Sequence, residues 1–235
     1  MMLIKKLRKD LKKHANKEKA KILQSFFKTG PGEYGHGDKF IGVVVPSVRK
    51  IAQQYIDADL KSVLELLKSA IHEERLLALI ILILQYEKGD NFKKKVIFTI
   101  YLKYTRYINN WDLVDLTAGR IIGDYLLKKD KTILFKLARS IDLWERRISI
   151  IASFAFIRNG QFTQTLKISR ILLKDKEDLI HKAVGWMLRE IGKRDIESEE
   201  FFLRKEYKKM PRTMLRYAIE RFSEQKRQAY LKGTV

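Results

Sequence analysis

Apolar residues recur every three or four positions over most of the chain, the spacing that places them on one face of an α-helix. Between Ser47 and Met210 there is no proline, the residue that most strongly interrupts helices. Few segments show the strict alternation of apolar and polar residues that is typical of strands. The pattern therefore predicts helices over residues 60–68, 73–87, 92–104, 111–128, 131–138, 143–158, 162–173, 177–193, 199–208 and 212–222.

The breaks between these segments are short and polar. They are Gly89-Asp90, Asn109-Asn110, Lys129-Asp130, Asn159-Gly160 and Lys174-Asp175. Asp and Asn are preferred at the start of a helix, where the side chain accepts a backbone N–H. Glycine is preferred just after the end of a helix, so Gly89 and Gly160 are expected to act as C-terminal caps.

The predicted helices form pairs at a regular interval. Pairs begin near His72, Asn109, Asp142, Glu177 and Pro211, which lie 33 to 37 residues apart. This is the length of a two-helix repeat with short turns. We expect an all-α fold, an α-solenoid of antiparallel helix pairs that forms a single domain over residues 1–235 with a concave basic cleft. The repeats share no residue consensus, so a compact irregular helical domain remains open.

The balance of charge narrows the class of partner. The 235 residues contain 49 Lys and Arg against 28 Asp and Glu, a net charge of +21. Such an excess favours a polyanionic partner, with nucleic acid ahead of anionic lipid. At 46% hydrophobic residues the chain can still fill a core. Because no residue is cysteine, neither a disulfide framework nor a thiolate metal site is expected.

Other features exclude further classes of protein. The four histidines, His14, His36, His72 and His181, are scattered, so we expect no metal and no cofactor. The N-terminal segment alternates charge with leucine, and the longest apolar run, from Leu76 to Leu84, is far too short for a membrane span. We therefore expect a cytoplasmic protein without a membrane partner.

Clusters of lysine and arginine are candidate contacts with a duplex backbone, although such runs are more often solvated helix faces. The clusters contain Lys5, Lys6, Arg8, Lys9, Lys12 and Lys13, then Lys93 to Lys95, then Lys205, Lys208, Lys209 and Arg212. The net charge favours nucleic-acid binding more strongly than any one cluster does.

Each of the three tryptophans stands beside a charge at helical spacing. Trp111 precedes Asp115 by four residues, Trp144 precedes Arg147 by three, and Trp186 precedes Arg189 and Glu190 by three and four. Residues three or four apart share a helix face, so each indole lies beside an ionic group. Trp111 and Arg147 are 36 residues apart, and Arg147 and Trp186 are 39 apart, each close to one repeat. Together with Asp115, these residues are therefore expected to line one cleft. The alternative is that the tryptophans pack between helices with their charges paired at the rim.

Two further motifs have structural interpretations. The glycine-dense segment from 30 to 38 lacks the GK[ST] sequence of a nucleotide-binding loop and is expected to be a connector, with Tyr34 or His36 as a possible contact with DNA. Glu73 and Glu74 fall at a predicted helix start. Acidic residues there complement the helix dipole, which we favour over a catalytic role.

The segments around the tryptophans resemble the AlkD family of DNA alkylation-repair glycosylases, which are built from HEAT-like helical repeats. The resemblance rests on NNWDLVD (109–115), LWERR (143–147) and HKAVGWMLRE (181–190). It continues through residues 32–52, 71–79 and 208–222, and so covers nearly the whole chain. It implies that Asp115 is the catalytic aspartate, that Trp111 and Trp186 are cleft tryptophans, and that Arg147 is the cleft arginine. Trp144 is expected to pack behind Arg147.

The resemblance also implies the reaction and the partner. We expect hydrolysis of the N-glycosidic bond of cationic N3- or N7-alkylpurines in double-stranded DNA, by a monomer, with the lesion left in the duplex and a phosphate held by Arg147. The alternative is a non-catalytic helical-repeat module that binds DNA, RNA or a ribonucleoprotein, which would leave Asp115 without a role. A protein scaffold is disfavoured because its surface need not be so basic.

Overall fold

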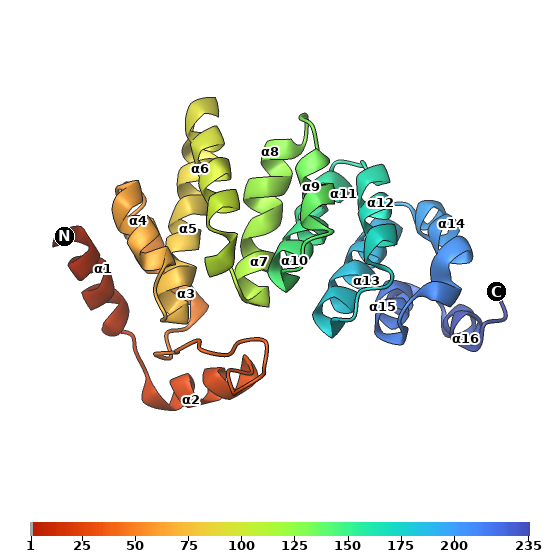
Figure 1. Ribbon diagram of the computed structural model, residues 1–235, viewed down its shortest axis with the longest axis horizontal. Coiled ribbons are helices and arrows are strands. Elements are labelled where there is room, and N and C mark those ends of the chain that lie inside the picture. The colour runs from red at the N-terminus through yellow and green to blue at the C-terminus, as the bar shows by residue number, and fades with distance from the viewer. Residues whose placement is uncertain (1) are drawn as a thin grey trace. The chain divides into compact units, whose positions relative to one another are not determined.

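The structure, a computed structural model, describes residues 2–235 and consists of helices joined mostly by short turns, with one long connection, residues 27–44, between the second and third helices (Figure 1). Over these residues there is no strand, and the one isolated β-bridge pairs Lys39 with Ile71. The α-helices are α1 (Met2–Lys12), α2 (Lys17–Phe26), α3 (Val45–Gln54), α4 (Leu60–Leu67), α5 (His72–Lys88), α6 (Asn91–Lys103), α7 (Trp111–Ala118), α8 (Asp124–Leu126), α9 (Thr132–Leu137), α10 (Leu143–Ala152), α11 (Phe154–Arg158), α12 (Thr163–Leu172), α13 (Asp178–Gly192), α14 (Ile196–Glu206), α15 (Arg212–Ala218) and α16 (Glu224–Lys232). The all-α prediction is confirmed.

The chain divides into two compact units, the first ending at Leu113 and the second beginning at Val114. The expectation of a single domain over residues 1–235 stays a prediction. The boundary falls inside α7, so this helix contributes its first three residues to the first unit and the rest to the second.

The first unit is organised around α5. Every residue from His72 to Ile83 in this helix is buried, because α3, α4 and α6 pack against it. A helix that is apolar nearly all round needs such cover on several sides. Helix α1 packs on α3 and α4 and contributes Ile4, Leu7 and Leu11 to the core.

The second unit repeats this arrangement around α13, which contacts α10, α12, α14 and α15. Helix α10 in turn contacts α9 and the π-helical turn Gly119–Gly123. Figure 1 shows successive helix pairs of this unit stacked side by side. This is the packing of an α-solenoid, as the sequence predicts. The HEAT-like character and the concave basic cleft stay predictions.

The predicted repeat interval is present in the structure. The helices that open successive pairs, α5, α7, α10, α13 and α15, begin at residues 72, 111, 143, 178 and 212. The predicted helix over residues 111–128 is confirmed to Leu126, with the π-helical turn inside it, and the one over 143–158 is divided at Ser153. Asp90 caps the start of α6, because its Oδ1 accepts the backbone N–H of Lys93 at 2.8 Å. Gly89 is the C-cap residue of α5, as predicted, with φ −78°, and Gly160, directly after the C-cap residue of α11, has the left-handed conformation at φ 69°.

The pattern misses helices α1, α2, α3 and α16. Helix α2 has no buried residue and α16 buries one side chain, Tyr230, so neither shows a clear apolar stripe. Helix α3 contains Pro46 in its first turn, where proline is tolerated because its missing N–H would have no helical partner. No helix in residues 2–235 combines the length and apolar character needed to cross a membrane.

Helices α13 and α15 approach closely at Gly185. A Cβ at this position would lie 2.5 Å from the carbonyl oxygen of Met214 and 2.5 Å from Tyr217 Cβ, closer than atoms can approach. The contact is therefore made by backbone atoms, and glycine is required for it although it is a poor helix former.

We expect Gly185→Ala to lower the free energy of unfolding by about 1–3 kcal/mol, because the added methyl forces α13 and α15 apart. Urea unfolding followed by circular dichroism measures the change. Gly119→Ala is the matched control, since its Cβ would meet its nearest atom at 3.6 Å. Equal stability of the Gly185 variant and wild type would show that the two helices do not meet this closely.

Glu199 in α14 is a buried acid with one carboxyl oxygen, Oε1, that has no hydrogen-bond partner among the described residues. Burial, with a smaller contribution from the neighbouring Glu200, raises the pKa of Glu199 from 4.5 to about 8, against the opposing effect of Arg189. The folded protein therefore favours the neutral acid.

This raised pKa predicts a loss of stability as pH increases. Between pH 4.5 and 8 the unfolded chain ionises Glu199 freely, whereas the folded chain keeps the proton. The contribution of Glu199 to the free energy of unfolding is therefore fully present below pH 4.5 and falls as the pH rises to about 8. Glu199→Gln should reduce this loss, and Glu197→Gln, which alters an exposed residue of the same helix, should not. Thermal unfolding at several pH values measures the difference, and parallel curves for wild type and Glu199→Gln would contradict it.

Candidate functional site

Asp115 and Arg147 form the central ion pair of the second unit. Arg147 on α10 donates from Nε to Asp115 Oδ1 at 2.8 Å and from Nη2 to Oδ2 at 2.7 Å, so both carboxylate oxygens are held. Its Nη1 also donates to the carbonyl oxygen of Leu179 in α13. The arginine thus connects α7, α10 and α13.

The two members of this pair differ in exposure. The Arg147 side chain is 6% exposed, whereas the Asp115 side chain is 19% exposed. The Arg147 guanidinium, which we expect to bind a phosphate, donates two hydrogen bonds to the Asp115 carboxylate. Its contacts with described residues use three of the five N–H groups of a guanidinium.

Trp186 lies half-buried on α13, one helical turn before Glu190. Its Nε1 donates to Glu190 Oε1 at 3.3 Å, and its ring centroid lies 6.0 Å from that of Phe154. Lys193 and Arg194 also bind Glu190. Burial acts to raise the pKa of Glu190, but these cations and the indole N–H outweigh it and lower the pKa. The acceptor of the indole is therefore a carboxylate at neutral pH.

Trp111 opens α7, the helix that carries Asp115 one turn later. In the first unit its indole stacks on Phe27, with centroids 5.2 Å apart, and meets Phe26 edge-on at 6.0 Å. Its Nε1 donates to Tyr34 Oη at 3.2 Å. The aromatic cluster fixes the ring while leaving it half-buried. The sequence pattern did not identify Phe26, Phe27 or Tyr34 as its neighbours.

Trp144 differs from the other two tryptophans because it is buried, at 8% exposure. It lies on α10 three residues before Arg147. This burial agrees with the packing role that the sequence suggests.

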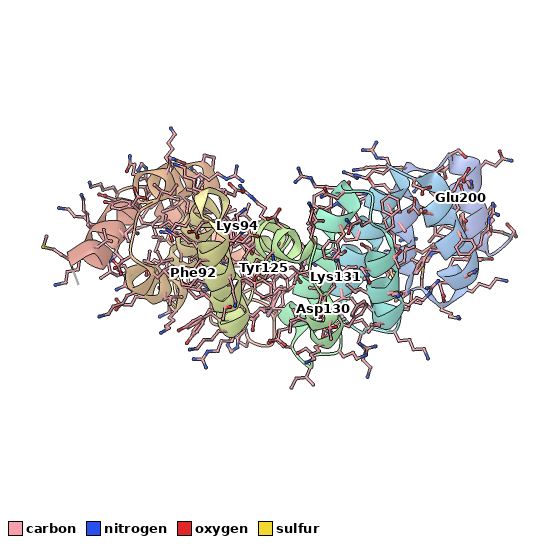
Figure 2. The ribbon with its side chains drawn as sticks, turned by 90° about the horizontal axis from the view of Figure 1, so that it is seen from above. Phe92, Lys94, Tyr125, Asp130, Lys131 and Glu200 are labelled. Carbon is pink, nitrogen blue, oxygen red and sulfur yellow. The ribbon has the colours of Figure 1, made fainter. Side chains whose placement is uncertain are left out.

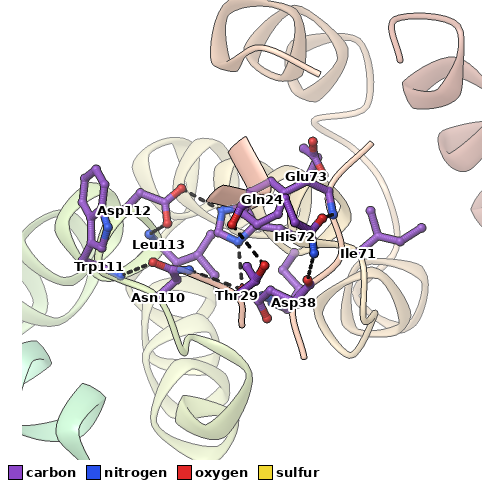
Figure 3. Close-up of polar contacts among 12 residues, drawn as sticks. Gln24, Thr29, Asp38, Ile71, His72, Glu73, Asn110, Trp111, Asp112 and Leu113 are labelled. Carbon is purple, nitrogen blue, oxygen red and sulfur yellow. Dashed lines mark hydrogen bonds and ion pairs between the residues drawn. The ribbon is translucent and has the colours of Figure 1, made fainter. Parts of the chain in front are cut away.

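A polar cluster around His72 in the first unit was not predicted at all. His72 lies between Asp38 and Asp112, and Asn110 donates from Nδ2 to Asp38 Oδ2 at 3.3 Å (Figure 3). Asn110 is fully buried and also accepts the backbone N–H of Trp111 at 2.8 Å. Among residues 2–235, no group of three or more His, Cys, Asp or Glu could hold a metal ion.

The glutamates and the glycine-dense segment have structural contacts. Glu73 and Glu74 lie in the first turn of α5, as predicted, and both are buried. The Glu73 carboxylate accepts the backbone N–H groups of Ile41, Gly42 and Val43, and Glu74 pairs with Arg8 at 3.0 Å. Because Glu73 holds the backbone that follows the segment 30–38, this part of the chain is anchored.

Most of the predicted backbone-binding cations are exposed on helices. The exposed ones are Lys5, Lys6, Lys9, Lys12, Lys13, Lys93, Lys95, Lys205, Lys208, Lys209 and Arg212. Lys94 is half-buried, with Nζ 5.2 Å from the centroid of the Tyr86 ring; Figure 2 shows it on α6 beside the 76% exposed Phe92. Arg8 is half-buried and paired with Glu74. Their contact with DNA stays a prediction.

Comparison with known proteins identifies one family. The family described as "DNA alkylation repair enzyme" has a model that matches residues 7–222. The match covers most of both compact units and contains all four predicted site residues.

A solved structure described as a predicted DNA alkylation repair enzyme from Enterococcus faecalis has the same fold. It is similar with a TM-score of 0.70 and 15% sequence identity, over 90% of this chain and 98% of that one. No curated protein sequence matches the chain. At this identity the structural likeness concerns the fold alone.

We expect Arg147→Ala to lower the free energy of unfolding by about 3 kcal/mol, because it removes three hydrogen bonds and leaves a part-buried carboxylate without its main partner. Urea unfolding measures the change. Lys21→Ala, which breaks an ion pair on the surface of α2, should leave stability unchanged. If both variants were equally stable, the Arg147 pair would not be a structural contact.

Proposed function

The chain belongs to the DNA alkylation repair enzyme family, and from this premise we propose that it is a DNA glycosylase that hydrolyses the N-glycosidic bond of cationic alkylpurines in duplex DNA. The observation that carries the proposal is the Asp115 carboxylate, which is part-exposed and held through both oxygens by Arg147. The family supports a role in alkylation repair, and the carboxylate supplies the chemistry.

One carboxylate is sufficient for this class of substrate. An N3- or N7-alkylated purine already carries a positive charge, so it leaves without being protonated by an acid. As the bond to the sugar breaks, positive charge moves from the base to the deoxyribose in an oxocarbenium-like transition state. An anion placed near the sugar stabilises that state more than the ground state, which is the requirement for catalysis.

The electrostatic stabilisation that a carboxylate can give to this transition state is large enough for catalysis. A unit charge about 4 Å away contributes roughly 1 kcal/mol in water but about 4 kcal/mol at an effective dielectric constant of 20. A contribution of about 4 kcal/mol corresponds to roughly a thousandfold in rate. Asp115 also has the hydrogen-bonding capacity to orient the attacking water.

Arg147 has two roles in the proposal. It holds the plane of the Asp115 carboxylate, because Nε and Nη2 each bind a different oxygen. We propose that the N–H groups that these contacts do not use donate to a DNA phosphate beside the lesion, once the duplex reaches this side chain. A phosphate bound to this guanidinium would compensate part of its positive charge. The field that the Asp115 carboxylate exerts on the sugar would then be stronger.

Trp111 and Trp186 are proposed to contact the sugar and the cationic base. An indole face attracts a cation by roughly 0.5–2 kcal/mol, so the two rings favour charged lesions over normal bases. Each ring is half-buried and backed by another aromatic ring, Phe27 for Trp111 and Phe154 for Trp186. This support limits the entropy lost when substrate binds. The net charge of +21 supports attraction of the duplex backbone.

We expect wild type to release 7-methylguanine or 3-methyladenine from alkylated duplex DNA, and Asp115→Asn to lower the single-turnover rate by about a hundredfold or more, because the anion is lost. Chromatography of the excised base measures release. Wild-type binding to DNA without base release would overturn the proposal and favour the non-catalytic nucleic-acid module.

Asp175→Asn is the matched control. Asp175 is bound by the adjacent Arg146, whose Nε and Nη2 lie 2.6 and 3.3 Å from its two oxygens. It therefore repeats the Asp115 arrangement with the neighbouring residue of α10. The control should retain the wild-type rate, and equal losses in the two variants would attribute the Asp115 effect to damaged packing.

A further inference from the structure

His72 is enclosed by two carboxylates, one facing each of its ring nitrogens. Nδ1 lies 3.2 Å from Asp38 Oδ2, and Nε2 lies 2.8 Å from Asp112 Oδ2 (Figure 3). The imidazole is 2% exposed and stacks against Phe40, with ring centroids 4.5 Å apart. Phe27 lies near the same ring, with centroids 5.1 Å apart, so aromatic rings cover the imidazole, whereas the Asp112 side chain is 19% exposed.

This geometry requires two N–H donors on one ring. A neutral imidazole has one N–H and one lone pair, whereas an imidazolium has two N–H groups. With a neutral ring, a lone pair would face a carboxylate at one of the two contacts, which is repulsive. The arrangement is therefore complete only when His72 carries a proton on both nitrogens.

The cluster ends at the first turn of α7. Asp112 is the second residue of that helix, and Asn110, which precedes the helix, binds both Asp38 and the backbone N–H of Trp111. Trp111 is connected in turn to Tyr34 through its indole N–H. These hydrogen bonds connect His72 with the turn that begins with Trp111, one turn before Asp115.

We propose that His72, as an imidazolium bridging Asp38 and Asp112, clamps the start of α7 and is a positioning residue for base release. The role in base release rests on the proposed function, whereas the clamp on α7 does not. His72 reaches no reacting atom in this proposal and acts through the helix that carries Trp111 and Asp115.

The charges around His72 favour its protonated form. Burial lowers the pKa of His72, but the hydrogen bonds to Asp112 and Asp38 outweigh burial and the nearby Arg75, so the pKa lies above 6.5. Burial acts to raise the pKa of Asp38, yet His72 and Arg75, whose Nη2 is 2.7 Å from Asp38 Oδ2, lower it. The other charged neighbours are Glu73 and Glu74, which follow His72 in α5 and are occupied by backbone N–H groups and by Arg8.

The sign of the pH effect follows from the raised pKa. The clamp is complete below the unfolded value of about 6.5 and is lost as pH rises through the folded pKa of His72, because the neutral ring cannot donate to both carboxylates. Base release should therefore decline on the alkaline side, with a midpoint at the titration of His72.

NMR spectroscopy tests the clamp without any measurement of activity. We expect the His72 ring to titrate above pH 6.5, and the indole N–H resonance of Trp111 to move with the same midpoint while that of Trp186 does not. Asp112→Asn should lower the His72 midpoint by about one pH unit or more, because it removes one of the two anions. A His72 titration midpoint below its ordinary value would overturn the clamp. So would a Trp111 indole resonance whose chemical shift does not change as His72 titrates.

Single-turnover base release over a range of pH tests the positioning role. His72→Gln should lower the rate by about ten- to a hundredfold near neutral pH and remove the alkaline decline. His14→Gln, which removes an exposed imidazole just after α1, is the matched control and should do neither. If His72→Gln does not fold, Asp112→Asn should move the alkaline decline to lower pH. An unchanged profile in the folded variants would overturn the positioning role.

The two proposals fail in different ways. Absence of base release by wild type, together with the expected NMR titration, would remove the glycosylase assignment and the link to catalysis but leave the clamp on α7. Normal base release with a His72 ring that is neutral at pH 6.5 would remove the clamp and leave the glycosylase assignment.

Discussion

Ion pairs that connect one helix pair with the next are the interactions on which the stacking within each unit depends. Their partners lie about one repeat apart in the sequence: Asp115 and Arg147 are separated by 32 residues, Arg146 and Asp175 by 29, His72 and Asp112 by 40, and Arg170 and Glu206 by 36. A charge taken out of water is costly unless a partner compensates it. The pairs therefore specify the register in which amphipathic helices stack, while apolar burial supplies most of the stability.

The proposed catalytic aspartate is a member of this series. Asp115 is held by Arg147, which also reaches α13 through the carbonyl oxygen of Leu179. The same contacts that stack the helices therefore orient the carboxylate. If the proposal holds, helix-to-helix packing is enough to orient the reactive group, and the adjacent Arg146 and Asp175 pair resembles it in geometry alone. This packing also makes the function of Asp115 hard to separate from stability without matched variants.

The sequence predicted a helix correctly where one face of it is apolar. It did not predict a helix that is attached mainly by polar contacts. Helices α5 to α10 and α12 to α15 follow the predicted pattern closely. Helix α2 was missed because it buries no side chain, and is instead attached through hydrogen bonds such as that from Gln24 Nε2 to the carbonyl oxygen of Asp38. Spacing alone identified Glu190 beside Trp186, because residues four apart share a helix face.

By itself, the sequence determined the helical class, the repeat interval and the basic charge, because these depend on local spacing and composition, while its resemblance to the AlkD family supplied the four expected site residues. Tertiary structure decided which charges are paired. It turned the fork of Arg147 toward Asp115, buried Trp144 while leaving Trp186 half-exposed, and placed His72 between Asp38 and Asp112. The partners of His72 lie 34 and 40 residues away in opposite directions along the chain. No local pattern connects such residues, because only the packing of the helices and the path of the segment before α3 bring them together.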